Sequence, residues 1–188
     1  MAARAVRPRG IAAPRTVEDA VHRPATLAAA TVADVHDRRG RELFGLCRRL
    51  GLDEDEANDA VQEAFLRMWD QSSRGVLIVD PDAWAFRVAY RLAMDHHRFV
   101  RLARAVTDRL SARDEPYEID PADRWAVWAA VDNLPTRQRA VVYLRYRADL
   151  SYERIAVVMG ITAAGARNDA SAATASLRRR LQDDGAVR

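Results

Sequence analysis

Cysteine, lysine and long apolar runs are what this 188-residue sequence has least of. Cys47 is its single cysteine, so no internal disulfide forms, and the four histidines do not join further cysteines in the clusters that build tetrahedral zinc sites. No apolar stretch approaches the roughly 18 residues that span a bilayer, and the start of the chain lacks the apolar core of a secretory signal. We therefore expect a cytoplasmic protein without membrane insertion or a metal site.

Aromatic residues are also sparse, at 7% of the chain, whereas hydrophobic residues make up 49%. This composition suits small helical bundles better than a β sandwich, and the length fits one medium domain or two small ones. No nucleophile with an oriented base and no phosphate-cradling glycine loop is recognisable. The sequence therefore argues against an enzyme, and no cofactor is expected.

All thirty basic residues are arginine. The planar guanidinium group matches phosphate oxygens and guanine edges, so arginines that face nucleic acid are well equipped to bind it. Acidic blocks at 31–83 and 114–133 alternate with basic blocks at 84–113 and 134–188, although the net charge is only +3. Separate charged surfaces predict separate partners, and the small net charge disfavours indiscriminate nucleic-acid binding.

Helical periodicity begins near Ala33 and predicts an all-α fold of two small helical domains joined by a linker. Charges of both signs surround Pro116 and Pro121 in the linker, and the segment before the first domain lacks a sustained apolar period. The predicted boundaries are, in chain order, a flexible N-terminal arm at 1–30, a first domain at 31–104, a linker at 105–122, a second domain at 123–182 and a tail at 183–188.

Capping residues and apolar spacing predict the helices of both domains. Gly51 is placed to end the first helix, and Asp82 to cap the third. The expected helices after Gly51 run over about 55–70, 83 to beyond 98, 125–133, 136–146, 152–159 and 163–181.

The last two of these helices form a helix-turn-helix pattern. Ser151 is placed to cap the first of the pair, Gly160 to end it, and Thr162 to cap the second. In a helix-turn-helix, the second helix presents its N-terminal residues to the DNA major groove. An ordinary helical hairpin within a bundle gives the same pattern.

The helix over 57–69 has two different faces. One is an apolar stripe typical of packing on its own domain: Ala57, Ala60, Val61, Ala64, Phe65 and Met68. The other, about half a turn away, is acidic and amide-bearing with two large apolar residues, and is a candidate docking face: Asp59, Gln62, Glu63, Leu66 and Trp69. A solvated polar face, with Trp69 folded back into the core, also fits this spacing.

The following helix carries four arginines near one face beside an aromatic ring: Arg87, Arg91, Arg98 and Arg101, with Trp84. Guanidinium groups beside an aromatic ring suit a phosphate track with a stacking platform for an unpaired base. Asp95 interrupts this face. Pairing of Asp95 with Arg91 or Arg98 would make the face a salt-bridged, solvated surface instead.

Three blocks of this sequence resemble the sigma-70 family of bacterial RNA polymerase sigma factors, and they stand in that family's order. They are DAVQEAFLRMW at 59–69, DAWAFRVAYRLAMDHHR at 82–98 and NLPTRQRAVVYLRYRADLSYERIAVVMGIT at 133–162. The short linker leaves no room for the middle domain of larger members. The chain therefore resembles the two-domain extracytoplasmic-function (ECF) group, over roughly residues 40–181.

The resemblance implies a sigma factor that binds RNA polymerase core and directs promoter recognition, promoter opening and transcription initiation. The candidate docking face on 59–69 is then expected to bind the clamp coiled coil of the largest polymerase subunit. The helix over 84–98 and the loop before it, about 74–82, are expected to open the duplex at the minus-ten element and hold a flipped base. The helix-turn-helix is expected to read the minus-thirty-five element, with base contacts from Arg167, Asn168 and Ser171.

The expected recognition helix departs from the family pattern. Its sequence, TAAGARNDASAATASL, has Arg167 as its only cation, and Asp169 is expected to repel the DNA backbone. Gly165 costs about 1 kcal/mol relative to alanine inside a helix. Arg91, in turn, stands where the family often has asparagine. These departures predict that promoter selection depends mainly on the first domain, with Arg178–Arg180 left for phosphate contacts.

The altered recognition helix also motivates an alternative, a sigma-like DNA-binding regulator that no longer engages core polymerase. The acidic face with Asp59, Gln62 and Glu63 opposes this alternative. A small amphipathic interaction module would not explain the three ordered blocks. Sigma factors of this group are often held inactive by an anti-sigma protein, so the resemblance adds that partner to promoter DNA and core polymerase.

Overall fold

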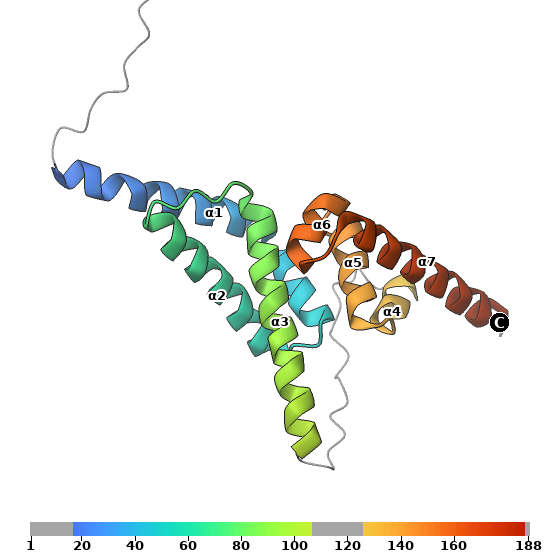
Figure 1. Cartoon of the computed structure of the whole chain (residues 1–188). Coiled ribbons are helices and arrows are strands. Elements are labelled where there is room, and N and C mark those ends of the chain that lie inside the picture. Colours follow the sequence, from blue (N-terminus) through green and yellow to red (C-terminus); the bar gives the residue numbers. More distant parts are fainter. Residues whose placement is uncertain (1–16, 107–125, 187–188) are drawn as a thin grey trace, which may run out of the picture.

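The structure, a computed structural model of the chain, describes the backbone of residues 17–106 and 126–186 and the side chains of residues 29–99, 127–180 and 182. All regular structure in these ranges is helical, which confirms the predicted all-α fold (Figure 1). The helices are α1 (Val17–Arg49), α2 (Glu54–Ser73), α3 (Pro81–Val106), α4 (Ala126–Asp132), α5 (Thr136–Tyr146), α6 (Tyr152–Met159) and α7 (Ala163–Ala186).

The junction between α1 and α2 follows from local chemistry. Gly51 has a left-handed φ of +89°, a conformation that glycine adopts without a Cβ clash, and α1 ends just before it. Asp53 then caps α2 by accepting a hydrogen bond from the Glu56 N–H at 2.8 Å, while the Glu56 carboxylate accepts one from the Asp53 N–H at 2.9 Å. This capping box satisfies backbone donors that a helix start leaves unpaired.

The start of α1 differs from the prediction. α1 begins at Val17, inside the segment predicted as a flexible arm, and continues through Pro24. The prediction relied on an apolar period, but residues 17–30 are rich in alanine, which has the highest helix propensity. Once a helix exists, each further residue adds a hydrogen bond without a new nucleation cost. Residues 1–16 of the predicted arm lie outside the described residues.

The start of α3 also differs, because Asp82 does not cap it. Asp80 is the cap, and its carboxylate accepts a hydrogen bond from the backbone N–H three residues later at 3.0 Å. Pro81 takes the first helical position, where its missing N–H has no cost. The Asp82 carboxylate is instead buried between α1 and α3, where it accepts hydrogen bonds from Arg38 at 3.0 Å and Arg39 at 2.9 Å.

The predicted helix-turn-helix is present as α6, a turn and α7. The Ser151 hydroxyl accepts a hydrogen bond from the Arg154 N–H at 3.3 Å, and Gly160 ends α6 in the left-handed region at φ +68°. The Thr162 hydroxyl accepts a hydrogen bond from the Gly165 N–H at 3.0 Å at the start of α7. A smaller apolar cluster joins α4, α5 and α7: Val131, Leu134, Val142 and Ala173.

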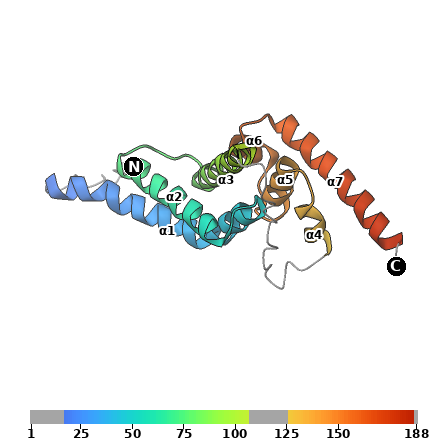
Figure 2. The ribbon, with the colours of Figure 1, turned by 90° about the horizontal axis from the view of Figure 1, so that it is seen from below.

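The two halves of the chain pack against each other and share one hydrophobic core. Fully buried side chains come from both halves, including Leu46 and Phe86 from the first and Leu144 and Ile155 from the second. α6 packs on α3, and α5 contacts α1. Seen from below, α3 lies between the α1–α2 pair and α5–α6 (Figure 2). The predicted linker lies largely outside the described residues, since α3 runs to Val106 and the description resumes at 126.

No helix in the described ranges is both long and apolar enough to cross a membrane.

Candidate functional site

The five residues of the candidate docking face lie together on α2, opposite its buried stripe. Leu66 and Trp69 expose 63% and 39% of their surface, so Trp69 is not folded back into the core. The three polar members are exposed or partly exposed, and Glu63 accepts a hydrogen bond from Arg67 Nε at 2.7 Å. The face thus combines acidic groups with two large apolar side chains that stay partly exposed to solvent.

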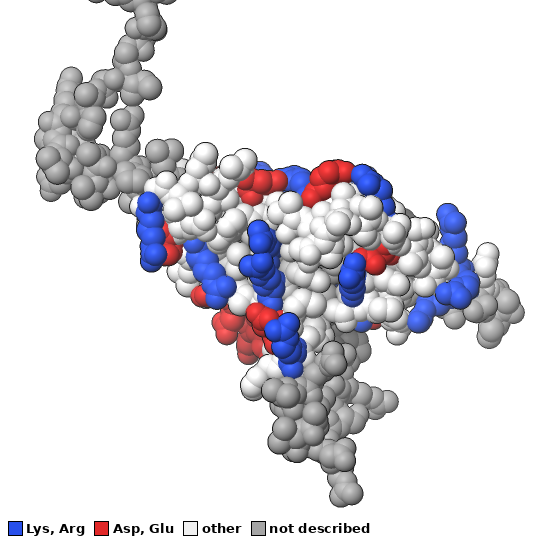
Figure 3. Space-filling view, viewed as in Figure 1, with Lys and Arg blue, Asp and Glu red and all other residues white. Residues whose placement is uncertain are grey.

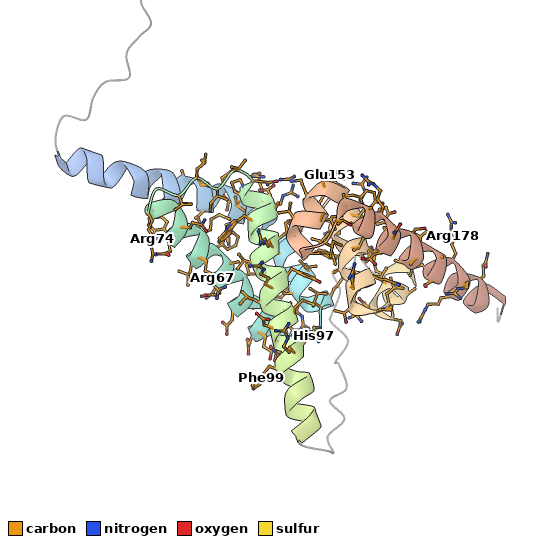
Figure 4. All side chains as sticks on the ribbon, in the orientation of Figure 1. Arg67, Arg74, His97, Phe99, Glu153 and Arg178 are labelled. Carbon is orange, nitrogen blue, oxygen red and sulfur yellow. The ribbon has the colours of Figure 1, made fainter. Side chains whose placement is uncertain are left out.

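A shallow, open hollow continues this face toward α3. Leu66, Val76 and Trp84 supply apolar lining, with Arg67 and Arg74 among the charged residues at its edge. Arg67 and Arg74 both project from the free side of α2 (Figure 4). Apolar anchors with a charged rim are typical of a protein-binding surface.

The loop between α2 and α3, which the resemblance links to promoter opening, contains a short apolar run. This loop exposes Val76, Leu77 and Val79 at 48%, 83% and 89%. Three large apolar side chains in solvent, next to the α2 face, mark the loop as part of an interaction surface. The signal in the sequence is an apolar run within an otherwise polar loop.

The arginines of α3 differ in their environments. Arg87 is half-buried and Arg91 is exposed, and within the described part of the chain neither forms an ion pair. Arg98 lies 3.9 Å from Asp95, with both side chains largely exposed, so this pair is loose. The salt-bridged alternative therefore applies to Arg98 and not to Arg91.

Trp84 and Arg101 complete the candidate minus-ten residues. Trp84 is partly buried and packs against the core at the N-terminal end of α3, where it also lines the hollow. The backbone of Arg101 belongs to α3, but its side chain lies outside the described residues. The structure therefore brings Trp84, Arg87 and Arg91 to one half of α3.

Arg167, Asn168 and Ser171 are all exposed on the N-terminal part of α7. Arg167 is not free, because its guanidinium donates a hydrogen bond to Glu153 on α6 at 2.8 Å. Its Cζ atom also lies 5.7 Å from the centroid of the Tyr152 ring. Arg167, the only cation in residues 162–177, is thus partly neutralised by contacts within the second half of the chain.

Asp169 does not face DNA as an unpaired anion, contrary to the expectation of backbone repulsion. Its carboxylate accepts a hydrogen bond from Arg137 Nε on α5 at 2.6 Å, and only 22% of its side chain is exposed. At Gly165, a Cβ would lie 3.2 Å from the Thr162 hydroxyl, a tight contact, and 3.9 Å from the Arg137 guanidinium, an ordinary one.

Basic side chains elsewhere on α7 remain exposed. Arg178, Arg179 and Arg180 are all solvent-exposed, and Arg178 points away from the body of the fold (Figure 4). Across the face shown in Figure 3, arginines form separate groups over α2, α3 and α7, with uncharged surface between them. This arrangement favours several local contacts over one continuous basic track.

The described residues contain neither a metal-binding cluster nor an accessible cysteine thiol. No cluster of three or more histidine, cysteine, aspartate or glutamate side chains suited to a metal ion occurs there. Burial raises the pKa of the Cys47 thiol to about 12, so the reactive thiolate is scarce at neutral pH.

Each half of the chain matches a known protein family. The family described as Sigma-70 region 2 matches residues 35–109, and Sigma-70, region 4 matches residues 124–177. ECF RNA polymerase sigma factor SigL of Mycobacterium tuberculosis is 30% identical over 166 residues, which cover 85% of this chain and 94% of SigL. SigJ of the same organism is 31% identical over 145 residues, covering 71% of this chain and 46% of SigJ.

Two solved structures share the fold. CnrH in complex with the cytosolic domain of CnrY is 24% identical, with a TM-score of 0.59 and coverage of 87% of this chain and 96% of that one. RpoE in complex with the anti-sigma factor NepR, from Bartonella quintana, is 20% identical, with a TM-score of 0.58 and coverage of 79% and 97%.

The helix-turn-helix and the arginine-bearing α3 define a helical, DNA-binding transcription protein built from two halves. The matches to both sigma-70 regions, together with the similarity to SigL over most of both chains, identify the family. The chain belongs to the sigma-70 family, in its ECF group, and it acts in promoter-specific transcription initiation.

Proposed function

We propose that the α2 face binds the clamp coiled coil of the largest subunit of RNA polymerase core. Glu63, together with Asp59 and Gln62, supplies polar contacts, and Leu66 and Trp69 supply the apolar anchors. The support is the exposure of both large apolar side chains beside acidic groups. Apolar surface is unfavourable in water, so burying it against a partner lowers the free energy of the complex.

We further propose that α3 and the loop before it open the duplex at the minus-ten element. Arg87 and Arg91 contact the strand backbone, with Arg98 and Arg101 farther along the same helix, and Trp84 offers a stacking surface. Unstacking a base costs a few kcal/mol, which base capture and guanidinium–phosphate contacts offset. Within the described part of the chain Arg87 and Arg91 form no ion pair, which supports this role, because neither must break such a pair to bind phosphate.

In the second half, Arg167, Asn168 and Ser171 are proposed to read the minus-thirty-five element from the N-terminal turns of α7. Arg167 must first give up its contact with Glu153, so binding here is weaker than at the minus-ten element. Arg178–Arg180 contribute phosphate contacts that carry no sequence information.

An anti-sigma protein is the proposed regulatory partner. The support is that the RpoE structure with a similar fold was solved with the anti-sigma factor NepR. In this proposal the chain works in the cytoplasm and supplies binding surfaces, while the polymerase supplies the chemistry.

The observation that carries the proposal is the juxtaposition of the exposed α2 face with Arg87 and Arg91 of α3, which form no ion pair among the described residues. It is tested by run-off transcription with core polymerase across a promoter library, together with co-purification of the two. The wild-type chain is expected to co-purify and to give discrete transcripts. DNA binding without either result would favour a regulator that does not engage the polymerase.

A further inference from the structure

The first turns of α7 pack on neighbouring helices through alanine. Ala166, Ala170 and Ala173 are buried, with exposed fractions of 0%, 3% and 0%. A single methyl group buries little apolar area and does not interlock with a facing side chain as a leucine does. Apolar packing therefore holds this part of α7 against the fold but specifies the rotation of the helix about its own axis only weakly.

Two charge-assisted hydrogen bonds lie on different sides of the same part of α7. Asp169 accepts one from Arg137 Nε on α5 at 2.6 Å, and Arg167 donates one to Glu153 on α6 at 2.8 Å. Arg167 and Asp169 are two positions apart, which is about 200° around a helix at about 100° per residue. Because hydrogen bonds between charged groups are short and directional, these two bonds specify the rotation that alanine packing leaves open.

The two bonds differ in what happens to them when DNA binds. Arg167 belongs to the proposed reading residues, and its guanidinium has to leave Glu153 before it contacts a base. The Asp169 side chain is only 22% exposed and faces α5, whereas Asn168 and Ser171 are exposed on α7. The bond between Asp169 and Arg137 is therefore compatible with bound DNA.

The rotation of α7 decides whether its side chains reach base edges. A side-chain end about 6 Å from the helix axis moves by about 3 Å when the helix turns by about 30°. A hydrogen bond to a base edge tolerates a displacement of only about 0.5 Å. A modest rotation of α7 is thus enough to break base contacts made by Asn168 and Ser171.

We propose that Arg137 is a positioning residue for base reading: through Asp169 it fixes the rotation of α7 that turns Arg167, Asn168 and Ser171 toward DNA. Arg137 acts through this bond and not by contacting a base. Asp169, an anion next to the reading residues, is then an anchor for α7. The inference rests on the proposed role of α7 in reading the minus-thirty-five element and adds a residue of α5 to it.

The positioning role is tested with holoenzyme, the full-length chain bound to core polymerase. Run-off transcription is measured from a promoter selected from the library and from the same promoter with a scrambled minus-thirty-five element. The wild type is expected to give a few-fold more transcript from the intact template, and this ratio reports base reading.

Asp169→Ala and Asp169→Asn separate positioning from simple electrostatics. Both remove an anion near DNA, so repulsion alone predicts more transcript from both templates in either variant. Only Asp169→Ala also removes the acceptor for Arg137, because the asparagine amide oxygen accepts the same hydrogen bond. We expect the ratio to fall to about 1 in Asp169→Ala and to keep the wild-type value in Asp169→Asn.

Arg137→Ala removes the other partner and is expected to give the same loss as Asp169→Ala. The exchanged pair, Arg137→Asp with Asp169→Arg, rebuilds the bond in reverse and is expected to recover the ratio. The control Asp37→Ala makes the Asp→Ala change at an exposed position of α1 and is expected to match the wild type. Arg137→Ala that lowers both transcripts equally, with an unchanged ratio, would make Arg137 a phosphate contact and overturn the proposal.

Hydrogen exchange of the free chain tests the bond without DNA. Alanine favours a helix more than aspartate, so helix propensity alone predicts slower amide exchange over residues 163–173 in Asp169→Ala. Loss of the bond to α5 predicts faster exchange there, because local opening then costs less free energy. Asp169→Asn is expected to exchange like the wild type. Circular dichroism checks that each variant stays folded.

The outcomes separate the failure of this inference from the failure of the proposed function. A few-fold ratio in the wild type that persists in Asp169→Ala, with no faster exchange, would overturn the role of Arg137 and leave base reading by α7 intact. A wild-type ratio of about 1 would overturn base reading by α7 and the positioning role with it. Absence of any transcript in the wild type would count against the proposed function as a whole.

Discussion

Arg87 and Arg91 of α3 and Arg167 of α7 carry the same guanidinium group but differ in whether it is already paired within the protein. Arg87 and Arg91 form no ion pair among the described residues, whereas Arg167 is bonded to Glu153 and lies beside the Tyr152 ring. An internal pair must be broken before its arginine binds phosphate, and that cost is subtracted from affinity. The two proposed DNA-binding surfaces therefore differ more than their formal charges indicate.

The same contrast extends to apolar surface. Among the described side chains, the first half exposes Leu66, Trp69, Val76, Leu77, Val79 and Phe99, while the second half exposes fewer large apolar ones, Val127, Tyr146 and Val157. Exposed apolar groups gathered on one face indicate a partner, and scattered ones do not. This contrast supports the proposal that the first half makes the main contacts with polymerase and promoter.

The largest expected effect concerns the α2 face. Glu63→Arg places a positive charge within the proposed docking surface, and we expect binding to core polymerase to fall by about 100-fold, because one reversed charge in an interface costs several kcal/mol. Surface plasmon resonance with immobilised core measures the loss. Asp37→Arg, the same change on α1, is the control and should bind normally. Undiminished binding by Glu63→Arg would remove this face from the interface.

The next effect concerns α3. Arg87→Ala and Arg91→Ala are each expected to weaken binding to fork-junction DNA by about tenfold and to lower the slope of log affinity against log salt by about 1, because each removes one phosphate contact. Fluorescence anisotropy over a salt series measures both quantities. Arg41→Ala on α1 should leave the slope unchanged. An unaltered slope for both α3 variants would place the DNA elsewhere.

A smaller effect, a gain in DNA affinity, is expected at the N-terminal turns of α7. Glu153→Gln removes the charge that holds Arg167, so binding to duplex DNA with the minus-thirty-five element should tighten by about threefold, while Arg167→Ala weakens it. In the double variant, the gain from Glu153→Gln should disappear. A gain that persists without Arg167 would mean that Glu153 acts by general repulsion of DNA.

The smallest effect is a pH dependence of the contact between the halves. Hydrogen bonding to Arg154 holds the pKa of Asp80 below its usual value and raises that of Arg154, with Arg39 also favouring the Asp80 anion. The stabilisation is therefore fully present above the ordinary aspartate pKa and is lost as pH falls through the lowered value. Because both side chains are more than a third exposed, we expect less than about 1 kcal/mol. Melting temperatures of wild type and Arg154→Ala, measured from pH 6 downward, should begin to converge only below the ordinary aspartate pKa.

Local features of the fold were predictable from the sequence because they depend on neighbouring residues. The caps at Ser151 and Thr162, the glycine stop at Gly160 and the inward stripe of α2 each need only a few adjacent side chains. The two faces of α2 followed from the helical period, and the exposure of Trp69 agrees with the docking interpretation. The assignment of roles to individual residues stays a prediction.

Long-range features were not predictable from the sequence. Asp82 has the right position for a cap, but Arg38 and Arg39, more than forty residues away in the sequence, bury it instead. Likewise, the burial of Arg49 against Asp132 and the pairing of Asp169 with Arg137 depend on how distant helices meet. Helix period and spacing carry no information on such contacts.

We propose that the first half dominates promoter selection. The most direct measurement is run-off transcription with core polymerase from three templates: a selected promoter, the same promoter with a scrambled minus-ten element, and one with a scrambled minus-thirty-five element. We expect the scrambled minus-ten element to abolish the transcript and the scrambled minus-thirty-five element to reduce it by only a few-fold. A transcript that survives loss of the minus-ten element but not loss of the minus-thirty-five element would contradict the account.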